Sequence, residues 1–271
     1  IGIKTGAAQN MVALGFIEDQ FGVSVTWGAW FLYAAPFSII MSIALYFIMI
    51  NLIKPETDTV EGGRDVIKKQ LAELGPLKGK EIRLIITSVA LLFLWATEGI
   101  VHPFDTTTVT IVAIAILLTP KIGVYTWNEV ERLIPWGTII VFAVGIALGT
   151  VLLNTKGAQW LSDTVFGSLG LDSMPLLATI AIVTIFNILI HLGFASATSL
   201  ASALIPVFIV LASTITANGD QQVGFVLIQQ FVISFGFLLP ISAPQNMLAY
   251  GTGAFTTKDF LKSGIPLTII G

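Results

Sequence analysis

The sequence predicts an all-α, polytopic membrane protein with inverted repeats, a re-entrant hairpin and broken helices. The first reason is composition: the chain is 55% hydrophobic and 11% charged, with a mean hydropathy of +0.90, whereas soluble domains carry roughly a quarter charged residues. The second reason is the number of long apolar segments. The third is a polar sequence motif that occurs twice in apolar surroundings, as AAQNMVALG from Ala7 and as APQNMLAYG from Ala243, and that we call the repeated phrase.

Membrane-spanning helices are predicted wherever about 20 mostly apolar residues follow one another. This requirement is met by residues 28–53, 84–101, 107–119 with their flanks, 135–154 and 222–240. The apolar run 172–214 is interrupted by ASATSLAS, so it forms either a re-entrant hairpin or two crossings. Short segments, 7–17 and 246–254, follow the two copies of the phrase, and a further helix begins within 259–271.

One polar segment sets the predicted topology. Residues 54–83 hold seven of the 13 Lys and Arg residues, and the positive-inside rule places such a segment in the cytoplasm. Its VIKKQLAEL stretch has amphipathic helical spacing, which we interpret as a solvated connector rather than as a partner-binding helix. If successive spans cross the membrane in alternating directions from this segment, Lys156 is the one basic residue in the loops on the opposite side. We therefore expect an integral protein of the bacterial inner (plasma) membrane.

The repeated phrase is predicted to interrupt a membrane helix in each repeat. Small and polar residues occupy GAAQN at 6–10 and LPISAPQN at 239–246, and the two prolines of the second copy disfavour helix. Unwound backbone inside a membrane must face protein or a watery cavity, and the positive end of each restarting helix suits an anion. In the topology above the two copies run in opposite directions, as in secondary transporters with inverted repeats. The simpler alternative is a proline kink, with Asn10 or Asn246 capping the restarted helix.

The same features exclude several kinds of function. The chain has no cysteine and a net charge of −3, so it offers no thiolate metal site and does not suggest a nucleic-acid partner. Two histidines without an HExxH motif provide no recognisable catalytic residues for a membrane enzyme. A channel is a second rival, but repeated broken helices without a charged ring fit a single gated site better. If the two copies belong to equivalent repeats, the segments that precede the second copy should also precede the first. We therefore expect this sequence to be the later part of a larger chain. It opens at Ile1 without a signal-peptide pattern.

Four stretches resemble the divalent anion:sodium symporter family. They are HLGFASATSLASALIPVF at 191–208, IPWGTIIVFAVGIALGTVLLNTKGAQWLSD at 134–163, ISAPQNMLAYGTG and TGAAQNMVAL. The resemblance is closest to the branch of dicarboxylate exchangers that includes plastidic 2-oxoglutarate/malate translocators and bacterial citrate/succinate antiporters. It implies exchange of substrates such as 2-oxoglutarate, malate and succinate, with a sodium-coupled dicarboxylate symporter as the alternative. No cofactor is expected, apart from Na⁺ in the symporter case.

The resemblance also implies a homodimer in the lipid bilayer whose protomers work as elevators. The moving transport domain would comprise residues 1–27 and 172–271, and the scaffold helices would lie in 84–154. Residues 28–83 would form a membrane helix and the cytoplasmic connector. Residues 155–171 would form an interfacial connector, with Trp160 at the level of the headgroups.

In this family a Ser-Asn-Thr signature at each hairpin tip holds the substrate carboxylate. Here the tip reads Ser196-Ala197-Thr198, which lacks the central amide but keeps the backbone N–H of Ala197. The first hairpin would lie upstream of this sequence. Carried over by position, the substrate-binding residues would be Gly6, Ala7, Asn10, Ser196, Ala197, Thr198, Ser242, Ala243, Pro244 and Asn246.

Two basic residues stand near the positions where sodium binds in coupled relatives. Lys4 precedes the first unwound segment and His191 precedes the hairpin tip, so both are candidate substitutes for the cation. The alternatives are that Lys4 snorkels to the membrane edge and that His191 is a neutral member of a polar seam with Thr184 and Asn187. Because a side-chain cation cannot dissociate as a bound sodium ion does, such residues would favour obligate exchange of substrates.

The remaining polar residues in apolar surroundings carry weaker signals. His102 and Glu98 are interpreted as capping or solvated groups at the end of a span. Gln229 and Gln230 interrupt an apolar helix, so at least one of them should face the interior of the bundle, for packing or for substrate contact. The glycines of YGTG at 250–253 lack a phosphate-loop frame, and no nucleotide site is expected.

Overall fold

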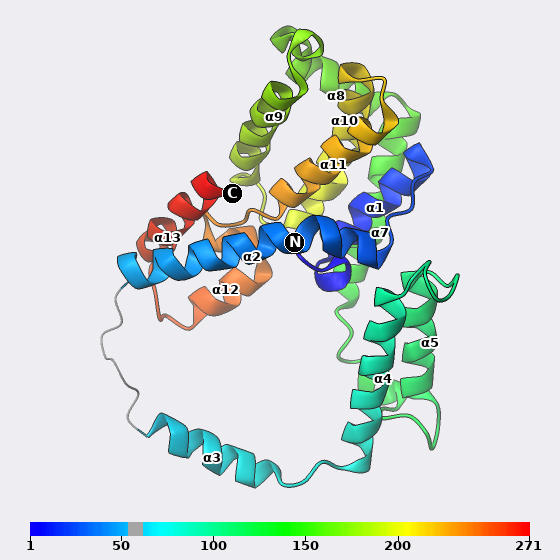
Figure 1. The fold of residues 1–271 in the computed structure, drawn as a ribbon, viewed down its shortest axis with the longest axis vertical. Helices are drawn as coiled ribbons and strands as arrows, with labels where there is room; N and C mark the ends of the chain where they lie inside the picture. Colours follow the sequence, from blue (N-terminus) through cyan, green and yellow to red (C-terminus); the bar gives the residue numbers. More distant parts are fainter. Residues whose placement is uncertain (54–61) are drawn as a thin grey trace. The chain divides into compact units, whose positions relative to one another are not determined.

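The structure, a computed structural model, describes residues 1–53 and 62–271 (Figure 1). These residues form α-helices and short 3₁₀ turns, with no strand among them beyond one isolated bridge between Glu98 and His102. The all-α prediction is confirmed. The chain divides into two compact units, one of residues 1–25, 30–53 and 136–271 and the other of residues 26–29 and 54–135. Residues 54–61, the start of the predicted polar connector, lie outside the described residues.

The first unit contains the two copies of the repeated phrase and the interrupted apolar run. Its helices are α1 (Ala8–Phe21), most of α2 (Trp27–Leu52), α7 (Trp136–Asn154), α8 (Gly157–Phe166), α9 (Leu176–His191), α10 (Ala197–Ile215), α11 (Gly219–Ile233), α12 (Pro244–Gly251) and α13 (Thr257–Ile270). The apolar run is therefore two helices, α9 and α10, joined by residues 192–196.

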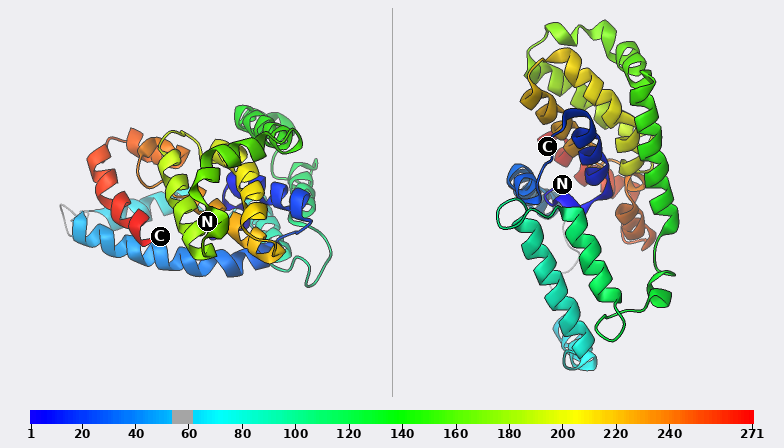
Figure 2. Two further views of the ribbon diagram at one scale, coloured as in Figure 1. Left: turned by 90° about the horizontal axis from the view of Figure 1, so that it is seen from above. Right: turned by 90° about the vertical axis from the view of Figure 1, so that its right-hand side faces the viewer.

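Helix α10 is the core of this unit. It packs against α1, α7, α8 and α11 (Figure 2), and Leu200, Ile205 and Phe208 on it are completely buried. Of its most apolar 18-residue window 61% is buried, against 17% for α2 and 6% for α7. Since all three helices are long and apolar enough to cross a membrane, α10 is covered by protein, whereas α2 and α7 leave most of their apolar surface available to lipid.

The second unit contains α3 (Gly63–Leu74), α4 (Gly79–Ala96), α5 (Thr106–Leu118) and the short α6 (Trp127–Val130). The Glu98 carboxylate accepts hydrogen bonds from the Trp27 amide (2.7 Å) and from the Thr106 amide (3.1 Å) and hydroxyl (2.8 Å). It thus caps the first turns of two helices, as the sequence suggested for this residue. At the start of α5, the Thr108 hydroxyl and amide also hold the pKa of Asp105 below its usual value.

Several helices end earlier in the structure than the apolar sequence predicts. The expected 84–101 helix ends at Ala96, before a turn in which Gly99 has a φ of +73°, a conformation that favours glycine. The 107–119 helix has 13 residues and stops before Pro120, and the 222–240 helix stops at Ile233. A glycine turn after α4 and Pro120 after α5 therefore coincide with the ends of these two helices.

Both predicted amphipathic segments are helical. VIKKQLAEL lies in α3, which has no buried residue among those described. The 157–170 segment contains α8, whose Ala158, Ser162 and Phe166 are buried on one face while Trp160 is 66% exposed. The spacing of four residues between the buried positions is that of a single helical face.

Candidate functional site

The two copies of the repeated phrase adopt the same backbone conformation. In the first, a 3₁₀ turn at Lys4–Gly6 leads to an extended Ala7 (φ −152°, ψ 139°) and then to α1. In the second, a 3₁₀ turn at Pro240–Ser242 leads to an extended Ala243 (φ −151°, ψ 143°) and then to α12. The predicted helix break is confirmed at the second copy, which lies between α11 and α12, and the first copy has the same backbone before α1. A proline kink does not account for the first copy, because that copy contains no proline.

The asparagine of each copy holds the unwound backbone in place. Asn10 is fully buried and its amide nitrogen lies 3.3 Å from the carbonyl oxygens of both Ile3 and Lys4, while its oxygen accepts from Gln230 Nε2 at 3.1 Å. The amide of Asn246 donates to the carbonyl of Gly236 at 2.9 Å. These bonds give partners to carbonyl groups outside the α-helices, where an unpaired carbonyl would be costly inside a membrane.

A cavity of about 760 Å³ lies where the two breaks meet the tip between α9 and α10. Its lining residues come from four segments: Gly6, Ala7, Ala8 and Gln9; Ser196, Ala197, Thr198 and Ser199; Ser234, Gly236, Ser242, Ala243 and Gln245; and Gly137, Thr138, Val141 and Phe142 of α7. The volume is within the usual range of small-molecule sites. Segments far apart in the sequence thus converge on one site.

The cavity has the electrostatic character of an anion site without a charged side chain among its described lining residues. Helices α1, α10 and α12 all start at it, since Ala8, Ala197 and Gln245 of their first turns line it. First-turn amides lack acceptors within the helix, and the positive end of the helix dipole lies there. Hydroxyls of Ser196, Thr198 and Ser242 add further donors. Neutral donors of this kind hold a carboxylate well.

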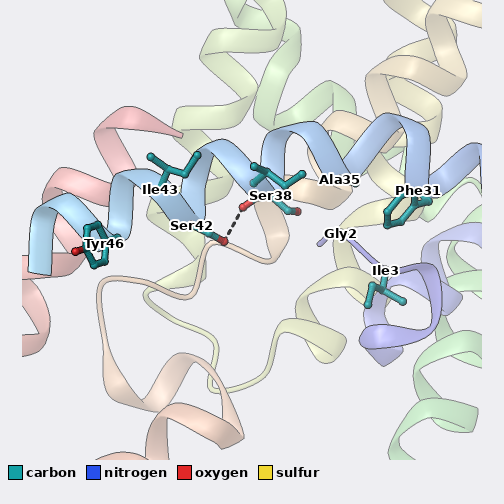
Figure 3. Close-up of a pocket in the computed structure, with 9 residues that line it drawn as sticks. Gly2, Ile3, Phe31, Ala35, Ser38, Ser42, Ile43 and Tyr46 are labelled. Atoms are coloured by element: carbon teal, nitrogen blue, oxygen red, sulfur yellow. Dashed lines mark hydrogen bonds between the residues drawn. The ribbon is translucent and has the colours of Figure 1, made fainter.

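A second hollow, along α2, does not have this character (Figure 3). Its volume is about 490 Å³, and apolar side chains such as Phe31 and Ile43 line it. Its serines are Ser38 and Ser42, and the Ser42 hydroxyl already donates to the Ser38 carbonyl at 2.8 Å. This groove does not suit an anion.

The structure brings seven of the ten carried-over residues to the cavity wall: Gly6, Ala7, Ser196, Ala197, Thr198, Ser242 and Ala243. Asn10 and Asn246 are not in the wall and bind backbone instead. Pro244 begins α12, and its side chain lies outside the described residues.

Other residues of the cavity wall were not predicted from the sequence. Gln9 and Gln245 had a signal, because both belong to the repeated phrase. The α7 wall residues between Gly137 and Phe142 had no such sequence signal, since only tertiary packing shows that this apolar helix reaches the site.

Both candidate cations are buried outside the cavity wall. Lys4 is 6% exposed and lies in the first 3₁₀ turn, and His191 is 3% exposed at the end of α9. Neither ring nitrogen of His191 has a hydrogen-bond partner in the described part of the chain, and the backbone of Ser242 lies near the ring. His191 is therefore close to the second break.

The polar seam exists, but His191 is not bonded to it. Asn187 donates to the backbone carbonyl of Gln229 at 3.0 Å, and Gln229 Nε2 donates to the Thr184 hydroxyl at 3.2 Å. Gln229 and Gln230 are both fully buried, and neither lines the cavity. These two glutamines connect α11 to α9 and to Asn10, so packing accounts for their position in the bundle.

Comparison with known proteins identifies the chain. The family profile described as the sodium:sulfate symporter transmembrane region matches residues 1–271. The chain belongs to this symporter family. The expected membership in the divalent anion:sodium symporters is therefore confirmed, and with it the polytopic membrane fold.

Three relatives show what this symporter-family chain is similar to. It is 47% identical to a membrane protein of Cupriavidus necator, over 100% of this chain and 53% of that protein. It is 25% identical to the citrate/succinate antiporter of Escherichia coli K12, over 98% and 53%. It is 24% identical to a sodium-dependent dicarboxylate transporter of Staphylococcus saprophyticus, over 100% and 53%. The chain spans about half the length of the curated relatives it matches, and those with named functions are transporters rather than enzymes.

Proposed function

We propose that the protein is a secondary transporter that exchanges dicarboxylates such as 2-oxoglutarate, malate and succinate across the bacterial inner membrane. The observation that carries the proposal is the cavity at which two similarly folded breaks and the α9–α10 tip converge. Small-molecule carriage is further supported by the names of the relatives, which include a citrate/succinate antiporter. The residues proposed to hold the substrate are the seven carried-over wall residues, together with Pro244.

The cavity chemistry supports a dianion as the substrate. Burying a carboxylate away from water is costly unless hydrogen bonds replace its hydration shell. First-turn amides of α1, α10 and α12 and the hydroxyls of Ser196, Thr198 and Ser242 supply such bonds. Because no carboxylate side chain is among the described wall residues, nothing in the wall repels the substrate.

The buried Lys4 and His191 support exchange over sodium-coupled symport. Each lies close to one break and is almost fully buried, and intramembrane basic residues are functional candidates because their burial is costly. Basic groups that belong to the protein cannot leave with the substrate, so the return of an empty carrier would be slow. A loaded carrier is close to neutral and moves readily. The alternative, a sodium-coupled symporter, is supported by the relative named as sodium-dependent.

We also infer the family's mode of operation for this protein. Residues 1–27 and 172–271 would form the moving transport domain of a homodimeric elevator, with 84–154 as scaffold and 54–83 in the cytoplasm. In support, α1, α10 and α11 pack together around the breaks, and the two breaks repeat each other's backbone. Helix α7, which we expected in the scaffold, clusters with the first compact unit and contributes to the cavity wall.

Counterflow in liposomes tests the proposal. The purified full-length protein is reconstituted in sodium-free buffer, and labelled succinate uptake is compared between vesicles loaded with succinate and empty vesicles. Exchange predicts rapid uptake only into loaded vesicles, unchanged by added sodium. Strict sodium dependence with uptake into empty vesicles would establish the symporter alternative, and absence of uptake under all conditions would contradict dicarboxylate transport.

A further inference from the structure

Gln9 and Gln245 are a pair of equivalent side chains in the cavity wall. Each is the residue after the first residue of its helix, since α1 begins at Ala8 and α12 at Pro244. Each follows an extended alanine with nearly the same φ and ψ. Both line the cavity. The repeat therefore presents one amide side chain from each break to the same space.

The side-chain amides of Gln9 and Gln245 have N–H groups available for a ligand, unlike those of Gln229 and Gln230. Gln9 Nε2 makes one long hydrogen bond, to the Ser234 hydroxyl at 3.4 Å. Gln245 is exposed and makes no side-chain hydrogen bond with the described part of the chain. In contrast, Gln229 and Gln230 are fully buried and donate to other side chains. An amide nitrogen has two N–H groups, so both wall glutamines can donate to a ligand.

The rest of the wall makes these amides the longest polar side chains in the cavity. The other described wall residues are Gly, Ala, Ser and Thr, with Val141 and Phe142 on α7. Serine and threonine hydroxyls reach only a short distance from the backbone. A glutamine side chain is long enough to donate to a carboxylate nearer the middle of a cavity of about 760 Å³. Being neutral, it does so without fixing a charge in the site.

We propose that Gln9 and Gln245 each donate to one carboxylate of the dianion, so that the two-fold repetition of the site matches the two charged ends of the substrate. This inference rests on the proposed function. It makes the pair a determinant of specificity for ligands with two carboxylates. Each amide supplements the first-turn N–H groups of its own helix, and neither residue belongs to the carried-over set.

The test measures succinate exchange by the full-length protein in preloaded proteoliposomes. The variants Gln9→Met and Gln245→Met keep the length of the side chain and remove its donors. Each is expected to raise the KM for succinate by about ten- to a hundred-fold, since hydrogen bonds to charged groups are among the stronger ones. The KM of the double variant should rise by about the product of the two single effects, because the amides bind different carboxylates. Gln70→Met, on the exposed surface of α3, is the matched control and should leave KM unchanged.

Charge substitution separates substrate contact from a structural role. Gln9→Glu and Gln245→Glu keep almost the same shape but place a negative charge against the dianion, so the KM should rise further than in the Met variants. These variants also carry the test if a Met variant fails to fold. Unchanged KM values in both Gln245 variants, with active wild type, would overturn the inference and leave the proposed function intact. A wild type that exchanges no dicarboxylate would overturn both.

Discussion

Asn10 offers the most quantitative test of how the first break is held. Its side chain is fully buried and takes part in three hydrogen bonds, to the carbonyls of Ile3 and Lys4 and from the Gln230 amide. At about 0.6–1 kcal/mol for each bond in a membrane protein, Asn10→Ala should lower the free energy of unfolding by about 2–3 kcal/mol. The loss is compounded at the fully buried Gln230, because its Nε2 donates to Asn10 and would lose that acceptor.

Asn246→Ala is the matched control, because it removes the equivalent residue of the second copy but only one bond, to the Gly236 carbonyl. Its cost should be about 1 kcal/mol. The assay is thermal unfolding of the purified full-length protein in detergent, and we use about 2–4 °C in Tm for 1 kcal/mol, the value for domains of about 150–250 residues. We expect a decrease of about 5–10 °C for Asn10→Ala and of about 2–4 °C for Asn246→Ala. Equal decreases, or an unchanged Tm for Asn10→Ala, would refute this assignment of the bonds.

Three further predictions address charge, packing and topology. Lys4→Met and His191→Gln should each reduce sodium-free exchange by about tenfold or more, because about 1.4 kcal/mol of lost charge compensation is worth a factor of ten; unchanged rates would remove these residues as cation substitutes. Gly145→Ala should cost about 1–3 kcal/mol by overpacking, since its Cβ would lie 2.5 Å from Ser202 Oγ, whereas Gly15→Ala meets nothing within 4 Å and should not destabilise. Because the chain has no cysteine, Gln70→Cys and Lys156→Cys can be labelled singly with an impermeant thiol reagent. Labelling from opposite sides of the membrane is expected, and labelling from the same side would contradict the topology.

The sequence predicted the fold class because its signals were local. Apolar length, proline and the repeated phrase are visible without tertiary contacts, and they indicated the helices, the divided 172–214 run and both breaks. Helix ends were less accurate, because apolar residues continue past the points where Gly99 and Pro120 end α4 and α5. Hydropathy records solvent preference, whereas a helix ends where backbone geometry requires it.

The candidate site was predicted in part, for a related reason. Residues beside the breaks, such as Ala7 and Ser242, could be found because the phrase marks them. The asparagines Asn10 and Asn246 looked like ligands in the sequence, yet the structure directs their amides to backbone carbonyls. Which way a polar side chain points from a broken helix depends on neighbours such as Gln230, and those neighbours are distant in the sequence. The α7 wall at Val141 and Phe142 was likewise invisible without packing.

The most direct test of a dianion held between the breaks and the α9–α10 tip is protection of engineered thiols. Ala8→Cys and Ser199→Cys place a thiol in the cavity wall on two different segments, and Gln70→Cys on α3 is the control. In sodium-free buffer, succinate should slow the labelling of both wall cysteines and leave the control unchanged, whereas the monoanion butyrate should protect neither. Labelling of both wall cysteines that is unaffected by saturating succinate, in protein that still exchanges succinate, would place the substrate elsewhere and contradict the account.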